Sequence, residues 1–405
     1  MANVSSSNGL EKRPKLRFPG FGEPWKETTL SALFSKSTQK NADGHITNVI
    51  CNSAKLGLIP QREYFDKDIA NSDNTSGYYI IRQNDFVYNP RKSYDAPYGP
   101  IRSYKYAEDG IVSPLYLCFH AKRKINPMYY EWYFRSSAWH RYIYMSGDSG
   151  ARHDRVSIKD DTFFAMPINL PSEREQSKIA SFLQSLDERI AAQEKLVASL
   201  KKYNRGLLSQ LIAQKKAFDT SGEWKTVKLG HIFKERTERA KGNETLLAVT
   251  ISNGVQRRDE IDLKDNSSDD KSNYKCVYIG DIAYNTMRMW QGASGVSPYN
   301  GIVSPAYTIV TPIRPDLHNM TFWAYYFKYS PLVQTFQKYS QGLTSDTWNL
   351  KFPQFSEIAV TMPPISEQDK IAECLSVFDE HCKCEDEKLQ ALLQVRTSLL
   401  QQLFI

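Results

Sequence analysis

The chain has 405 residues, of which 41 % are hydrophobic, and a formal net charge of +7. This length and composition suit two or three folded domains and exclude a disordered chain, and no run of about 18 apolar residues is present to cross a membrane. The first residues lack an apolar signal segment and the six cysteines are scattered, so we expect a cytoplasmic protein without a disulfide framework. The mild positive charge suits an acidic partner such as nucleic acid, although many ordinary enzymes are equally basic.

The first expected elements are a basic N-terminal tail, residues 1–17, and a globular domain over residues 18–170. Short runs rich in β-forming residues, such as Ser76–Asn89 and Gly110–Phe119, are separated by Pro, Gly, Asn and Asp. One helical stretch, Pro127–Tyr144, interrupts these strands. The pattern predicts a compact α+β domain.

Residues 171–216 change to a helical period. From Ile179 the apolar side chains recur at spacings that alternate between 4 and 3, which is the heptad seam of a coiled coil. A helix of about 40 residues is on the order of 60 Å long, and it must bury this narrow stripe against a partner. Polar insertions stand at Gln193 and Asn204. The seam consists of Ile179, Leu183, Leu186, Ile190, Val197, Leu200, Leu207 and Leu211.

Residues 217–362 repeat the first domain. The pentapeptide Gly-Ile-Val-Ser-Pro at Gly110–Pro114 returns at Gly301–Pro305, and Trp25 is answered by Trp224. A repeated pentapeptide is roughly a few-per-cent event by chance, and the other matches fall in the same order, so the chain is an internal duplication. We therefore predict a second α+β domain like the first.

A second helical region, residues 363–405, aligns with the first at an offset of 192 (363 minus 171) without a gap. Its polar insertions, Glu385 and Arg396, fall at the phases of Gln193 and Asn204. Antiparallel pairing of the two helices is favoured, because the intervening domain leaves the end of one helix and returns to the start of the other. Packing of each helix on another subunit is the alternative. The second seam consists of Ile371, Leu375, Phe378, Cys382, Leu389, Leu392, Leu399 and Leu403.

The sequence shows no catalytic or cofactor motif. No Gly-x-x-x-x-Gly-Lys-Ser/Thr loop and no Gly-x-Gly-x-x-Gly turn is present to hold nucleotide phosphates. Met362–Ile365 lacks the polar and aromatic residues of the Pro-Pro motif of amino-methylating enzymes, and it fits the start of a helix. His381, Cys382 and Cys384 are of the types that bind zinc, but they face different directions around a helix. We expect a binding protein with no metal of its own.

Three loop groups at corresponding places in the two repeats combine Arg, Lys, Asn, Gln and aromatic residues, the chemistry that reads base edges and phosphates. Group one is Tyr88–Asp95 with Tyr284–Gly292, group two is Lys55–Glu63 with Ser252–Glu260, and group three is Ser146–Arg155 with Ser340–Trp348.

Residues that hold the fold should recur between the repeats, whereas residues that read different bases should not. The shared Tyr88, Asn89, Tyr284 and Asn285 are therefore interpreted as scaffold. For one pair of arginines, Arg257 and its neighbour, a solvated surface pair is an equal alternative. The predicted DNA-contacting residues are Arg62, Arg91, Lys92, Arg152, Arg155, Arg257, Arg258, Arg288, Trp290, Gln291, Thr344 and Ser345.

Gly280–Tyr307 and Pro363–Glu380, with a Trp-Lys pair at each domain start, resemble the specificity (S) subunit of type I restriction-modification systems. The basic opening Arg13–Phe21 is similar too, although the first repeat lacks the Trp-Gln-Gly that follows Tyr284 and Asn285 in the second. The resemblance implies two target-recognition domains, each reading half of a bipartite asymmetric DNA site. It also implies helical spacers that set the half-site spacing and dock two methyltransferase (M) subunits.

The resemblance further implies that the chain is a non-catalytic partner in DNA methylation and phage defence, in the cytoplasm of a bacterium or archaeon. S-adenosylmethionine is expected on the M subunits, and ATP and Mg on the motor-nuclease (R) subunits that join for restriction. Two alternatives remain: a coiled-coil adaptor that bridges two proteins without binding DNA, and an enzyme whose site carries no recognisable motif.

Overall fold

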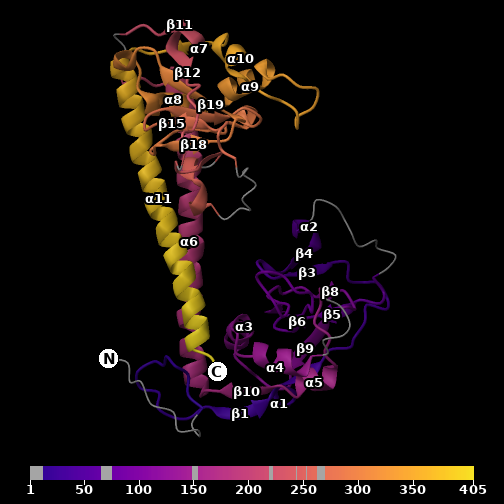
Figure 1. The fold of residues 1–405 in the computed structure, drawn as a ribbon. Helices are drawn as coiled ribbons and strands as arrows, with labels where there is room; N and C mark the ends of the chain where they lie inside the picture. The colour runs from indigo at the N-terminus through magenta and orange to yellow at the C-terminus, as the bar shows by residue number, and fades with distance from the viewer. Residues whose placement is uncertain are drawn as a thin grey trace. The chain divides into compact units, whose positions relative to one another are not determined.

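The computed structural model (Figure 1) describes residues 12–64, 75–147, 154–218, 222–242, 244–251, 253–261 and 270–405. The chain divides into two compact units. Unit 1 is Met1–Glu194 with Lys388–Ile405, and unit 2 is Lys195–Glu387. Each unit holds one globular α+β domain, as the duplication predicts, and one part of each long helix. We refer to the globular parts as domain 1 and domain 2.

Domain 1 contains a four-stranded sheet in the order β2-β9-β6-β7 and three strand pairs, β1-β10, β3-β4 and β5-β8, all antiparallel. Its strands are β1 Lys26–Thr29, β2 Phe34–Lys36, β3 Ile50–Ser53, β4 Gly57–Pro60, β5 Tyr79–Ile81, β6 Phe86–Tyr88, β7 Ile101–Ser103, β8 Gly110–Val112, β9 Leu117–Ala121 and β10 Pro167–Leu170. Its helices are α1 Leu30–Leu33, α2 Gln61–Tyr64, α3 Pro127–Arg135, α4 His140–Ser146 and α5 Asp160–Phe164.

Domain 2 repeats this topology, with a sheet in the order β12-β19-β16-β17 and the pairs β11-β20, β13-β14 and β15-β18. Its strands are β11 Lys225–Lys228, β12 Phe233–Glu235, β13 Leu247–Thr250, β14 Gly254–Arg257, β15 Lys275–Val277, β16 Ile282–Asn285, β17 Ser294–Val296, β18 Gly301–Val303, β19 Tyr307–Pro312 and β20 Ala359–Met362. Its helices are α7 Leu229–Ile232, α8 Met320–Tyr326, α9 Ser330–Tyr339 and α10 Phe352–Ser356, with 3-10 turns η2 Arg258–Glu260, η3 Met289–Gln291 and η4 Pro315–Leu317.

The first three residues of the repeated pentapeptide form β8 and β18, which are buried strands of two equivalent pairs. A Cβ atom at Gly110 would lie 2.7 Å from Ile50 Cγ1, and one at Gly301 would lie 2.4 Å from the carbonyl oxygen of Thr245. Both glycines are therefore required by close packing. The pentapeptide recurs because it belongs to the scaffold.

The predicted single helical stretch Pro127–Tyr144 is wrong, because the structure breaks it into α3 and α4. Asn126 caps α3 by accepting a hydrogen bond from the Tyr129 N–H, which is the usual role of Asn at this position. After α3 the chain turns so that Trp139 is buried, with its indole N–H donating to the Phe134 carbonyl at 3.0 Å. Burial of this large side chain outweighs the continuation of the helix.

Two long helices, α6 (Glu173–Ile212) and α11 (Ile365–Gln402), lie side by side in Figure 1. Two residues before each helix, a proline carbonyl accepts a hydrogen bond from a glutamine that recurs in both repeats, Gln176 to Pro171 at 3.1 Å and Gln368 to Pro363 at 2.9 Å. The structure describes no helix that is long and apolar enough to cross a membrane.

The two helices run antiparallel and pair within the chain. In unit 1 the start of α6 contacts the end of α11, since Arg396 binds Asp187. In unit 2 the end of α6 contacts the start of α11, since Tyr203 packs on Phe378 with ring centroids 5.4 Å apart. The buried seam residues are Ile179, Leu183, Ile190, Val197, Leu207, Leu211, Ile371, Leu375, Cys382, Leu389 and Leu403. The half-buried seam residues are Leu186, Leu200, Phe378, Leu392 and Leu399.

Residues that directly follow α11 complete the core of domain 1. Leu403 and Phe404 are buried in the same cluster as α3. The ring of Phe404 lies 5.6 Å from that of Tyr129 and 6.1 Å from that of Tyr133. Unit 1 is thus closed by residues that are distant in sequence.

Candidate nucleic-acid interface

The residues shared between the repeats form the base of the group-one loops. The buried Tyr88 stacks on Phe163 at 5.2 Å, and its equivalent Tyr284 stacks on Phe355 at 5.3 Å. Beside them, Asn89 Oδ1 accepts a hydrogen bond from the Arg91 N–H at 3.1 Å. Asn285 makes the same bond to the Met287 N–H at 3.0 Å. These side chains shape the loops from within, as an Asx turn does.

Loop groups one and three come together in domain 1. The Lys92 N–H donates to the Asp154 carbonyl at 2.9 Å, and the Val156 N–H donates to the Pro90 carbonyl at 2.9 Å. An antiparallel bridge pairs Arg91 with Arg155. Arg91 and Lys92 are exposed and Arg155 is half-buried. We call Arg91, Lys92 and Arg155 the basic ridge of domain 1.

Two other predicted residues of domain 1 have different places. Arg152 lies outside the described residues. Arg62 lies exposed on α2, at the open end of the β3-β4 hairpin. Asn52 of this hairpin contacts loop group one, because its carbonyl accepts a hydrogen bond from Asn89 Nδ2 at 3.2 Å. Its Nδ2 donates to the Val87 carbonyl of β6 at 2.8 Å.

Loop groups one and three also come together in domain 2. Trp290 in η3 meets Trp348 edge to face, with ring centroids 5.1 Å apart. The Leu350 N–H donates to the Thr286 carbonyl at 2.9 Å, which fixes the end of group three beside group one. The contact places five predicted residues on neighbouring loops. We call them the mixed surface of domain 2: Arg288, Trp290, Gln291, Thr344 and Ser345.

Most of the mixed surface is available to a ligand. Arg288, Gln291, Thr344 and Ser345 are exposed and Trp290 is half-buried. The Thr344 N–H donates to Thr347 Oγ1 at 3.1 Å, so the turn is closed from within. The conformation of this loop requires glycine at position 342, because Gly342 has φ +138° and a Cβ there would lie 2.5 Å from the Thr347 carbonyl oxygen.

Arg257 and Arg258 stand apart from the mixed surface, at the end of β14 and the start of η2. Arg257 donates to Asp259 at 3.3 and 3.0 Å, and hydrogen bonding to Asp259 raises its pKa. Arg258 Nη1 donates to the Ile261 carbonyl at 3.2 Å. The carboxylate of Asp259, two residues away, therefore forms an ion pair with Arg257.

The sequence interpretation missed two fully exposed apolar side chains in the loop groups. Tyr94 in loop group one of domain 1 is 101 % exposed, and Leu343 in loop group three of domain 2 is 100 % exposed. Each sits on a turn closed by hydrogen bonds, such as those between Ser93 and Ala96 at 3.0 and 3.2 Å. Nothing in their sequence context separates them from core residues, since exposure depends on the fold.

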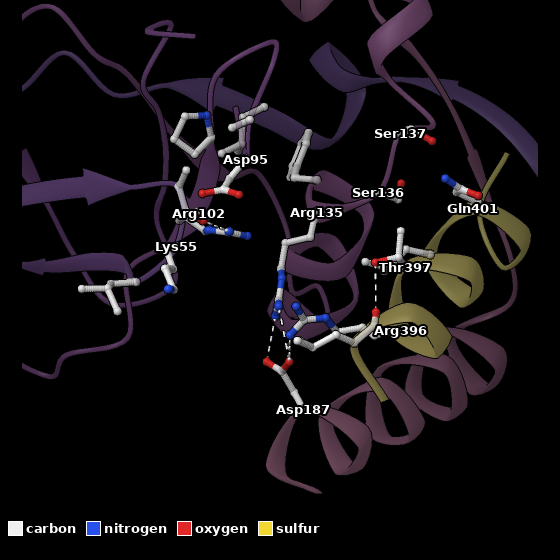
Figure 2. A pocket seen from close by; sticks show the side chains of 18 of the residues that line it. Lys55, Asp95, Arg102, Arg135, Ser136, Ser137, Asp187, Arg396, Thr397 and Gln401 are labelled. Carbon is white, nitrogen blue, oxygen red and sulfur yellow. Dashed lines mark hydrogen bonds and ion pairs between the residues drawn. The ribbon is translucent and has the colours of Figure 1, made fainter. Parts of the chain in front are cut away.

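The sequence interpretation also missed a pocket of about 730 Å³ in unit 1, between domain 1 and the helices (Figure 2). Three arginines line it, and each has a partner. Arg102 donates to the Ala54 carbonyl at 2.5 Å, and burial lowers its pKa to about 10. Arg135 and Arg396 both bind Asp187. The arginines therefore join elements of unit 1 to one another.

The comparisons with known proteins fit this geometry. The family model of the type I restriction modification DNA specificity domain matches residues 31–202 and again residues 221–394. The chain belongs to this family, and the two matches correspond to its two repeats.

Solved structures show the same fold over nearly the whole chain. The S subunit of a type I restriction-modification system from M. genitalium has a TM-score of 0.55 and 15 % identity, covering 97 % of this chain and 99 % of its own. The HsdS subunit from Thermoanaerobacter tengcongensis has a TM-score of 0.53 and 17 % identity, covering 96 % and 97 %. A chain from a structure concerned with complex assembly and conformational transition of the type I R-M system has a TM-score of 0.60 and 15 % identity, covering 96 % and 99 %. The search of curated proteins found no match.

Proposed function

We propose that this chain is the sequence-recognition subunit of a type I restriction-modification complex, and that each globular domain reads one half of a bipartite, asymmetric DNA site. One observation carries the proposal. In both domains the residues common to the repeats lie in the base of the loops, whereas the described differing residues of loop groups one and three lie on neighbouring loops. A common scaffold with different contact residues is the arrangement expected of two readers with unlike targets.

The two surfaces have the chemistry for different targets. The basic ridge of domain 1 offers guanidinium groups, which pair with guanine O6 and N7 or with phosphates. The mixed surface of domain 2 adds Gln291, an amide of the kind that pairs with adenine N6 and N7, and the hydroxyls of Thr344 and Ser345. The two half-sites should therefore differ in sequence.

The helix pair supplies the spacing and the docking positions in this proposal. Because α6 and α11 are repeats of one another, they offer two equivalent surfaces, which suits two copies of an M subunit. The half-sites should lie roughly one turn of DNA apart, about 34 Å. S-adenosylmethionine would be bound by the M subunits, and ATP and Mg by R subunits, with no cofactor on this chain.

The experiment that tests the proposal is selection from a random duplex library by the chain with its co-expressed M partner, followed by sequencing of the bound DNA. Two short, unlike motifs at one fixed spacing are the expected result. Enrichment of no motif, together with an affinity that does not fall as salt is raised, would instead favour an adaptor that does not bind DNA. Methyl transfer by the isolated chain would show a hidden catalytic site.

Single substitutions then assign each surface to a half-site. Arg91→Ala should weaken recognition at one half-site and Arg288→Ala at the other, each by about 1–3 kcal/mol, because each removes one set of base or phosphate contacts. Arg314→Ala is the matched control, since this exposed arginine of domain 2 is bound to Asp316 and lies outside the three loop groups. The assignment fails if the control changes DNA binding as much as Arg288→Ala does.

A further inference from the structure

An aspartate on α6 joins three elements of unit 1. Asp187 Oδ1 accepts a hydrogen bond from Arg396 Nη1 on α11 at 2.6 Å. Its carboxylate also accepts two bonds from Arg135 at the end of α3, at 3.1 and 3.4 Å. Figure 2 shows both guanidinium groups converging on this carboxylate. The contact therefore ties domain 1 to both long helices at once.

The equivalent aspartate in unit 2 makes an equivalent contact with different chemistry. Asp379 on α11 accepts a hydrogen bond from Asn204 Nδ2 on α6 at 2.6 Å. Its other oxygen accepts a bond from the Tyr325 hydroxyl on α8 of domain 2 at 2.7 Å. Burial lowers the pKa of Lys328 on the same domain, and the charge of Asp379 partly opposes this shift. Again one carboxylate ties a globular domain to both helices.

The two contacts are related by the duplication. Asp187 and Asp379 are 192 residues apart (379 minus 187), as are Asn204 and Arg396 (396 minus 204). The aspartate is shared, whereas the partners on the other helix and on the globular domain have changed from guanidinium groups to an amide and a phenol. The three-way geometry is kept although its chemistry is not, which indicates that the geometry itself matters.

The carboxylate of Asp187 is in the ionised state that this contact needs. Burial alone would raise the pKa of Asp187, but hydrogen bonds from Arg135 and Arg396 lower it below its usual value, so the acceptor is ionised at neutral pH. The guanidinium of Arg135 lies over the buried Trp132 ring at 4.0 Å, so the arginine is itself held by the core of domain 1.

We propose that Asp187 and Asp379 are positioning residues that fix the angle of each reading domain on the helix pair and so set the spacing between half-sites, without choosing the bases. This inference rests on the proposed function. An ion pair that only stabilises the helices would make no hydrogen bond to the globular domain. Lys201 and Asp386, paired at 2.7 Å, are such a case, because they join α6 to α11 alone.

The test uses the full chain with its M partner and a library of duplexes in which the two selected half-sites are separated by spacers of varied length. Asp187→Asn should keep both half-site sequences but accept longer and shorter spacers. Its affinity for the original spacer should fall about tenfold, because the hydrogen bonds from Arg135 and Arg396 lose their charged acceptor. Arg135→Gln should broaden the accepted spacers in the same way, because it removes the ion pair between domain 1 and Asp187 and leaves that of Arg396. Asp386→Asn is the control, and its spacer preference should equal that of the unchanged chain.

Each result has one meaning. If the unchanged chain selects no bipartite motif, the proposed function fails and not the inference alone. If the unchanged chain selects a motif at one spacing and Arg135→Gln and Asp187→Asn keep that spacing with unchanged affinity, the inference is overturned. A change of the bases selected by Arg135→Gln would also overturn it. Asp379→Asn should have a smaller effect than Asp187→Asn, because Asp379 is more exposed.

Discussion

A buried glutamate at the start of each long helix holds the segment that enters the domain. Glu175, 1 % exposed, accepts two hydrogen bonds from Arg17, at 2.7 and 2.8 Å. Its equivalent Glu367, also 1 % exposed, accepts a bond from the Phe218 N–H at 2.9 Å. Its Oε2 has no hydrogen-bond partner among the residues that the structure describes. The equivalent glutamates thus differ: Glu175 forms an ion pair, whereas Glu367 accepts a hydrogen bond from an uncharged backbone N–H.

This difference predicts unequal costs of the same substitution. Glu175→Gln should lower the free energy of unfolding by about 2–4 kcal/mol, because it leaves the mostly buried Arg17 without its counter-charge. Glu367→Gln should cost less, because the amide oxygen can still accept from the Phe218 N–H. Denaturant unfolding followed by far-UV circular dichroism measures both. Equal costs would show that the Arg17 pair adds nothing.

A second prediction at this scale concerns pH. Burial lowers the pKa of His140 and of His318 below the ordinary 6.5, so the folded chain favours their neutral forms. This stability is complete above about pH 6.5 and is lost as the pH falls below it, because the unfolded chain then binds protons more readily. Thermal unfolding at pH 7.5 and 5.5 should show a lower melting temperature at the lower pH. The drop should be smaller in His140→Gln, and an unchanged drop would contradict this cause.

Comparing the repeats predicted scaffold residues better than it predicted contacts. Tyr88 and Tyr284 were identified as scaffold because they recur, and both are buried. Asp187 recurs too, but its partners could not be predicted, because Arg135 and Arg396 meet it only once the domain is packed on both helices. The ion pair of Arg257 with Asp259, two residues away in sequence, was not predicted either.

At the scale of elements, the heptad seam predicts how severe a substitution is. Leu183→Asp should lower the free energy of unfolding by more than about 3 kcal/mol, because it places an unpaired charge at a fully buried position. Leu186→Asp and Phe378→Asp should cost less, since both side chains are half-buried. Circular dichroism and recovery of the M partner on the tagged chain measure helix pairing and docking.

The control for these variants is Ser181→Asp, an exposed position on the same helix. It should leave both readouts unchanged. A loss in Ser181→Asp equal to that in Leu183→Asp would mean that added charge, and not disruption of the seam, causes the effect.

The helices were the most predictable elements, because a period of 3.5 residues is written locally in the sequence. The helix expected to be about 40 residues long is Glu173–Ile212, which has 40. The break after α3 was not predictable in this way. Trp139 leaves the helical path to reach the core of domain 1, and that core is built from strands far away in the chain.

At the scale of the whole molecule, the duplication and the antiparallel pairing were predicted from repeats and from connectivity. The intervening domain must carry the chain from the end of α6 to the start of α11, and this argument needs no side-chain detail. The division of the helices between two units was not predicted. Each long helix contributes one part to unit 1 and one part to unit 2.

The closing of domain 1 by Leu403 and Phe404 has a consequence for the order of events at the ribosome. Unit 2 is one continuous segment, whereas the core of unit 1 waits for the last residues of the chain. More than 200 residues separate the end of domain 1 from these side chains. Because synthesis adds roughly 5–20 residues per second, this distance corresponds to a delay of roughly 10–50 s. Unit 2 is therefore expected to finish folding before unit 1. The nascent unit 1 must be kept from aggregating until Leu403 and Phe404 have been added to its core.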